Sequence, residues 1–235
     1  MRLVAGVLRM LLIGNVVLAT GCACFPQHMV PTVTAMPDMG PPSQRPIARM
    51  DVKFFAGEAD NNPTPLTGDQ PGVNDLVQVV HQTIDASGLF QQVHYSSSTP
   101  AGDSPVADAS DLHITLRIYD HCSATEAMVS SLITGLSLGL VPGGSTDSYT
   151  LQLEVTDNRG QTLARVSNED AARTYIGLVF LPMSGHDTTA SLHAVLANQI
   201  RAALKEAYDA GKLVAVNYSS SHDNHSGILP IGDAR

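Results

Sequence analysis

Aromatic side chains are scarce in this 235-residue chain. It has no tryptophan, and aromatic residues make up only 5% of the sequence. Clefts that bind carbohydrates commonly stack sugars on exposed rings. The composition therefore argues mildly against a sugar-binding protein.

Basic residues are also few, since 13 Lys and Arg stand against 22 Asp and Glu, for a formal net charge of −9. Nucleic-acid binding depends on clustered Lys and Arg that neutralise phosphates. We therefore expect no nucleic-acid partner. The same deficit predicts that basic residues do not hold the protein on an anionic membrane surface.

Long apolar runs are missing as well. The run from Met10 to Leu18 is broken by Gly14 and Asn15, and a membrane-spanning helix needs about 20 apolar residues. A basic start, a short apolar middle and the small residues before Cys22 are typical of an export signal. Residues 1–21 are therefore predicted to be a cleaved signal peptide.

The sequence Leu18-Ala19-Thr20-Gly21-Cys22 resembles the lipobox of bacterial lipoproteins, except that Ala19 stands where the family usually has Leu. The resemblance implies that Cys22 becomes the mature N-terminus and carries a diacylglycerol and a further acyl chain such as palmitate. Several acyl chains make such an anchor durable. Ala23, which is not Asp, implies sorting to the outer membrane, facing the periplasm. The alternative is an ordinary secretory signal with an incidental cysteine.

Two cysteines remain once Cys22 is lipidated. Cys24 and Cys122 form an even pair in an oxidising compartment, so a disulfide between them is one interpretation. The other is that Cys122 is a buried free thiol.

The mature chain divides by composition into three parts. Six prolines between Phe25 and Pro46 predict that residues 22–46 form an extended tether that holds the domain away from the bilayer. Residues 47–216 carry the periodic apolar patterns of one domain of ordinary size. Residues 217–235 form a polar tail.

Alternating apolar residues predict strands over 112–119 and 149–155, the latter followed by a hairpin turn at 157–160 and a returning strand around Leu163 and Arg165. Apolar residues also indicate a first strand over 47–55 and a short strand over 89–95. Helical spacing predicts helices from Val73 to Gly88 and from about Asp187 or Thr188 to Gly211. This order predicts an α/β (α+β) domain with a mixed or antiparallel sheet flanked by helices. It resembles the anticodon-binding-like fold of several envelope accessory lipoproteins, a likeness of architecture that carries function poorly.

Two apolar segments that contain glycine stand apart from this pattern, residues 128–144 and 175–183. Gly135 and Gly139 would share one helical face, where another helix could approach closely. The favoured interpretation is that both segments are buried core. The alternative is an exposed surface for a second subunit or an envelope partner, with contacts through Leu132, Gly135, Gly139, Leu140, Ile176 and Phe180.

Motifs for catalysis are weak. Nine histidines are present, but none has the spacing of a strong zinc signature, so no metal or other cofactor is predicted. Ser184-Gly185-His186-Asp187 contains hydrolase residue types, but neighbours in sequence point in different directions and do not form a triad.

The sequence thus predicts a non-catalytic envelope lipoprotein that acts as an accessory or assembly component, through an envelope protein partner or self-association. The alternative is an envelope hydrolase or metal-dependent enzyme whose site combines dispersed residues such as His113, His121, His186 and Asp187.

Overall fold

The computed structural model describes residues 21–70, 72–96, 110–122, 124–137, 139–183 and 188–213. The predicted signal peptide up to residue 20 and the predicted polar tail lie outside these residues.

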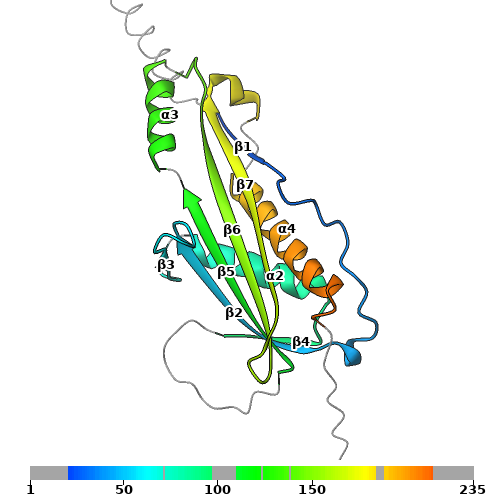
Figure 1. Cartoon of the computed structure of the whole chain (residues 1–235). Helices are drawn as coiled ribbons and strands as arrows, with labels where there is room; N and C mark the ends of the chain where they lie inside the picture. Colours follow the sequence, from blue (N-terminus) through cyan, green and yellow to red (C-terminus); the bar gives the residue numbers. More distant parts are fainter. Residues whose placement is uncertain are drawn as a thin grey trace, which may run out of the picture.

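A seven-stranded mixed sheet forms the frame of the described chain (Figure 1). Its strands are β1 (Gly21–Pro26), β2 (Ile47–Ala56), β3 (Thr64–Leu66), β4 (Gln92–Tyr95), β5 (Leu112–Cys122), β6 (Gly143–Asp157) and β7 (Thr162–Gly177). The helices are α2 (Val73–Ser87), α3 (Ala124–Leu136) and α4 (Thr188–Asp209), with short 3₁₀ turns η1 (Pro42–Gln44) and η2 (Leu178–Met183).

The strand order is β1-β7-β6-β5-β2-β3, and β4 also pairs with β2. β2 runs parallel to β4 and to β5, whereas the remaining pairs are antiparallel. The predicted α+β class with a mixed sheet flanked by helices is confirmed. The anticodon-binding-like resemblance stays a prediction.

The core lies between the sheet and helices α2 and α4, which lie behind the sheet in the view of Figure 1. On β5, Leu112, Ile114 and Leu116 are buried, while the residues between them are only half-buried. Burying one face of a strand with a period of two is what the sequence pattern predicts. Both helices end where expected, because Gly88 and Gly211 adopt the left-handed backbone that stops a helix.

The predicted tether is wrong, because the described residues between Gly21 and Pro46 are part of the folded domain. β1 pairs with β7 as an edge strand, and Ala23 and Cys24 are buried. Further along, Asn198 on α4 binds the backbone of Val30, Pro31 and Val33. The segment after β1 is therefore held to β7 through Met29 and to α4 through Val30, Pro31 and Val33.

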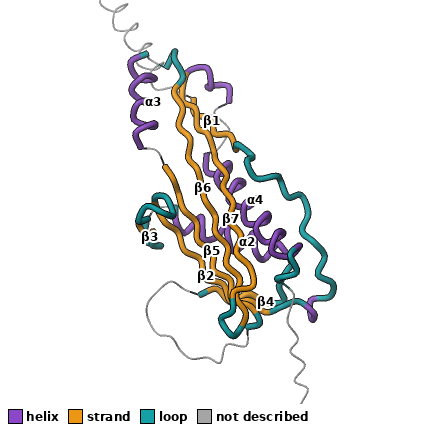
Figure 2. Tube along the Cα trace, viewed as in Figure 1, coloured by secondary structure: helices purple, strands orange, loops and turns teal. Residues whose placement is uncertain are grey.

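One end of the sheet is narrower than the other. β5 stops pairing with β6 at Asp147, so residues 143–146 of β6 pair only with β7. The chain leaves β5 and enters α3, which packs beside this free part of β6. Figure 2 shows α3, the ends of β6 and β7, η2 and the start of β1 gathered at this end.

Candidate functional site

Helix α3 turns its polar side toward the sheet. Thr134 is 6% exposed and its hydroxyl donates to the carbonyl of Ser130, 2.9 Å away. The Ser130 hydroxyl in turn accepts a hydrogen bond from the backbone N–H of Gly144. Hydroxyl groups thus fill the contact between α3 and β6, where a water-facing helix would place apolar side chains.

Gly143 makes this close contact possible. A Cβ at Gly143 would overlap the Thr134 hydroxyl and lie 2.6 Å from the carbonyl oxygen of Ser130. Only a residue without a side chain fits there without a shift of the helix. Sequence reasoning missed Ser130, Thr134 and Gly143, and the spacing of four between the two hydroxyl residues is the signal that would have found them.

The outward side of α3 is apolar. Met128, Leu132 and Leu136 lie one helical turn apart and are 76%, 63% and 80% exposed. The exposed large apolar side chains at this end of the described chain, called the apolar tip below, are Met128, Val129, Leu132, Ile133, Leu136, Leu140, Val141, Ile176 and Val179. In the described residues only Met29 is a large, exposed apolar residue outside this set.

The second apolar segment closes the same end. η2 follows β7 directly, and the N–H of Leu178 donates to the carbonyl of Gly139 at 3.0 Å. At the base of the tip, the ring of Tyr175 stacks on Phe180, with 5.3 Å between centroids, and also contacts Phe25. The guanidinium of Arg173 lies over the Tyr175 ring.

The favoured expectation that these segments are buried core is wrong, because most of their large apolar side chains are exposed. The partner that the alternative assigns to this exposed surface stays a prediction. Leu132, Leu140 and Ile176 are exposed, and Phe180 is half-buried. The predicted small-residue face is also wrong. α3 ends at Leu136, Gly139 lies beyond it with a positive φ of 81°, and Gly135 faces open space.

Cys22 lies at the base of the apolar tip. In the strand register it is opposite Ile176, which is opposite Gly143 on the next strand. Neighbouring strands are about 4.8 Å apart, so the three residues form a row about 10 Å wide. Cys22 is half-exposed at the second position of β1.

The structure does not support the interpretation in which Cys24 and Cys122 form a disulfide, because Cys24 is a buried free thiol. The other interpretation, a buried free thiol at Cys122, concerns a side chain outside the described ones. β7 and β6 separate β1 from β5. Three strand spacings amount to about 14 Å, and a disulfide joins Cα atoms less than about 7 Å apart.

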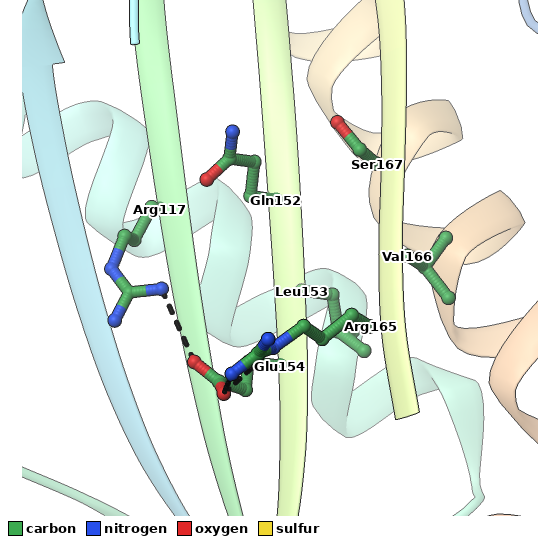
Figure 3. Close-up of a pocket in the computed structure, with 7 residues that line it drawn as sticks. All are labelled: Arg117, Gln152, Leu153, Glu154, Arg165, Val166 and Ser167. Carbon is green, nitrogen blue, oxygen red and sulfur yellow. Dashed lines mark hydrogen bonds and ion pairs between the residues drawn. The ribbon is translucent and has the colours of Figure 1, made fainter. Parts of the chain in front are cut away.

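The face of the sheet away from α2 and α4 is polar. Arg117, Gln152, Glu154, Arg165 and Ser167 line a hollow of about 420 Å³ on it (Figure 3). Glu154 accepts hydrogen bonds from Arg165 at 2.8 Å and from Arg117 at 3.4 Å. These contacts, above all the one from Arg165, lower the pKa of the Glu154 carboxyl. The charged side chains that line the hollow are therefore paired with one another.

The histidines proposed for an enzyme site are not brought together. His113 and His121 lie eight positions apart on β5, which corresponds to about 26 Å, so they cannot share a site. The His121 Nε2 pairs with the Thr150 hydroxyl at 2.8 Å. His186 and Asp187 lie outside the described residues.

Beside His121, burial and the nearby Asp147 raise the pKa of Asp120. Within the described residues, no three His, Cys, Asp or Glu side chains are close enough together to hold a metal ion. None of the helices in the described ranges has the length and apolarity needed to cross a membrane.

The comparisons with known proteins give weak likenesses. No family model matches the chain, and no curated protein matches its sequence. Among solved structures, a minor lipoprotein from Acinetobacter baumannii is 10% identical with a TM-score of 0.33, covering 71% of this chain and 93% of that one.

A dodecameric PelC variant from Paraburkholderia phytofirmans is 12% identical with a TM-score of 0.34, covering 79% of this chain and 98% of that one. A neuraminyllactose-binding hemagglutinin homolog from Helicobacter pylori is 6% identical with a TM-score of 0.37, covering 80% and 91%. These scores are too low to support an argument about function, which therefore rests on this chain's own residues.

Proposed function

We propose that this protein is a lipid-anchored lipoprotein of the bacterial cell envelope, attached through Cys22 to the outer membrane and facing the periplasm. It acts without catalysis, as an accessory or assembly component that binds an envelope protein or further copies of itself. The observation that carries the proposal is the lipobox-like sequence before Cys22, together with the position of Cys22 at the start of an edge strand.

The position of Cys22 suits an anchored protein. Cleavage before Cys22 would leave the mature chain starting within β1, so the lipid would be attached directly to the sheet. The cut would also remove Arg2 and Arg9 and no acidic residue, leaving 11 basic and 22 acidic residues. The charge of such an acidic domain does not attract it to anionic lipid. Covalent acyl chains would therefore supply the attachment to the membrane.

A binding role is favoured by the outward face of the sheet. Its charged side chains around Glu154 are paired with each other and held in place, which suits a polar contact with another protein. Of the residues named for the alternative enzyme, His113 and His121 are too far apart to share a site.

The test is the substitution Cys22→Ser in the full-length chain. Cells fed a clickable palmitate should label the wild-type protein and leave the variant unlabelled, because serine offers no sulfur for the diacylglycerol. Mass spectrometry of the wild-type N-terminal peptide should show Cys22 with its acyl chains. Cys24→Ser is the matched control and should label fully. A wild-type protein that takes up no palmitate would show the proposal to be wrong.

A further inference from the structure

We infer that the apolar tip is a membrane-contact surface that enters the lipid bilayer beside the acyl chains on Cys22. The inference rests on the proposed lipid anchor, and it adds a second, non-covalent contact with the same membrane.

The first step is the reversed polarity of α3. In water a helix buries its apolar side and exposes its polar side. Here Ser130 and Thr134 face the sheet, while Met128, Leu132 and Leu136 point outward. An exposed apolar face of this size is typical of a surface that binds another protein or a membrane.

The second step is the absence of charge. The sequence contains no Asp, Glu, Lys or Arg from Ala127 to Thr146, nor from Thr174 to Gly185. Interfaces between proteins commonly carry a polar rim with charged residues. A surface without ionised groups can enter hydrocarbon without the cost of burying a charge, which is at least about 2.5 kcal/mol per residue at the centre of a bilayer.

The third step selects the bilayer as the occupant. Ala23 is fully buried and β1 is paired from Gly21 onward, so there is no linker between the lipidated residue and the sheet. Acyl chains attached at Cys22 can enter the bilayer only if this end of the molecule lies at its surface. Ile176 is directly opposite Cys22 in the register, so the apolar tip begins within about 5 Å of the lipid attachment.

The base of the tip fits the region of lipid headgroups. Phe25, Tyr175 and Phe180 form a group of rings there, with Arg173 over the Tyr175 ring. Aromatic rings with a polar end and long basic side chains are favoured at the boundary between hydrocarbon and water. The apolar tip would then enter the bilayer up to this group of rings, which would lie among the lipid headgroups.

The absence of tryptophan allows a direct test. Full-length Leu136→Trp, lipidated in cells and purified in detergent, carries a single tryptophan at an exposed position of the tip. It is reconstituted into vesicles whose phospholipid acyl chains are brominated, since bromine quenches tryptophan only on contact. The matched control is Asn158→Trp, at an exposed position in the turn between β6 and β7, at the opposite end of the sheet (Figure 1).

We expect the Leu136→Trp protein to lose most of its emission in brominated vesicles relative to ordinary ones, and the Asn158→Trp protein to keep its emission. Leu140→Trp, outside α3 but also exposed, should behave like Leu136→Trp and covers the case in which α3 does not tolerate the larger ring. Equal emission of both tip variants in the two kinds of vesicle would overturn the inference.

Two further outcomes distinguish a failure of this inference from a failure of the proposed lipid anchor. Palmitate incorporation measured on the same samples reports Cys22 independently, so quenching in an unlabelled protein would support the tip and contradict the anchor. Tip tryptophans that are shielded from water in detergent, unquenched by bromine and found in particles of twice the mass would overturn the inference in favour of a second copy of the chain.

Discussion

At the scale of the residue, Gly143 fixes where α3 lies. A methyl group at this position would meet the Thr134 hydroxyl and the Ser130 carbonyl, which are bonded to each other within α3. It would also meet the Ser130 hydroxyl, which accepts from the Gly144 N–H and ties the helix to β6. The hydroxyl groups and the glycine therefore act together. Replacing any of them by a bulkier apolar residue would push the apolar tip away from β6.

We predict that Gly143→Ala destabilises the protein by about 1–3 kcal/mol, the usual cost of overpacking a close contact. Gly135→Ala is the matched control, because its Cβ would meet nothing within 4 Å. That substitution should stabilise the protein by up to about 1 kcal/mol through helix propensity. Urea unfolding followed by circular dichroism measures both, and equal midpoints for the two variants would contradict the assigned role of Gly143.

At the scale of the element, Asn198 on α4 holds the segment between β1 and β2 to the body of the domain. Asn198 is buried; its carbonyl oxygen accepts from Val33 N–H at 2.9 Å, and its amide donates to Val30 and Pro31. Such side-chain bonds replace the backbone partners that a proline-containing segment lacks. Together with the pairing of β1 with β7 and the bond from the Ser191 hydroxyl to the Cys24 carbonyl, they keep β1 and Cys22 on the domain.

We predict that Asn198→Ala loosens this segment at a cost of about 1–3 kcal/mol, because it leaves buried backbone groups without partners. Hydrogen exchange should become faster at Val33 and through β1. Asn74→Ala, which removes an exposed amide bonded to the Gly68 carbonyl, is the control and should leave β1 exchange unchanged. Unchanged protection of β1 in the Asn198 variant would show that strand pairing alone holds the segment.

Elements with a strong local pattern could be predicted from the sequence. The strand from Leu112 and the helix from Thr188 show periods of two and 3.6, and the structure places both as expected. β1 could not be predicted, because its partner residues on β7 lie about 150 positions away and the prolines from Pro26 to Pro46 favoured a tether. Pairing over such a distance leaves no local trace.

The exposure of the apolar tip could not be predicted from the sequence for a different reason. The sequence of an apolar segment shows that its side chains are hydrophobic, but it does not show whether they face the core or the outside of the molecule. Met128 and Leu132 were therefore expected in the core. The orientation of α3 depends on Ser130 and Thr134, whose partners include β6, a strand that the sequence of the helix alone does not place beside them.

At the scale of the whole molecule, the apolar and charged residues separate along the long direction of the sheet. The tip and Cys22 lie at one end, and the turn between β6 and β7 lies at the other (Figure 1). An acidic body with an uncharged apolar end would stand on a membrane with the tip inward, because the acidic surface gains nothing from anionic headgroups. The polar face around Glu154 would then be open to the periplasm.

This orientation predicts that one charge on the tip speeds the transfer of the lipidated protein between vesicles. Leu132→Glu removes a leucine from the bilayer and adds a carboxylate, and losing the leucine alone costs at least about 1.5 kcal/mol. The transfer rate should rise by about tenfold or more.

Met29→Glu is the matched control, since Met29 is similarly exposed but lies outside the tip, and it should transfer like the wild type. Transfer of a labelled protein from donor to acceptor vesicles gives the rates directly. If Leu132→Glu transfers no faster than Met29→Glu, the acyl chains carry all of the attachment and the tip does not enter the bilayer.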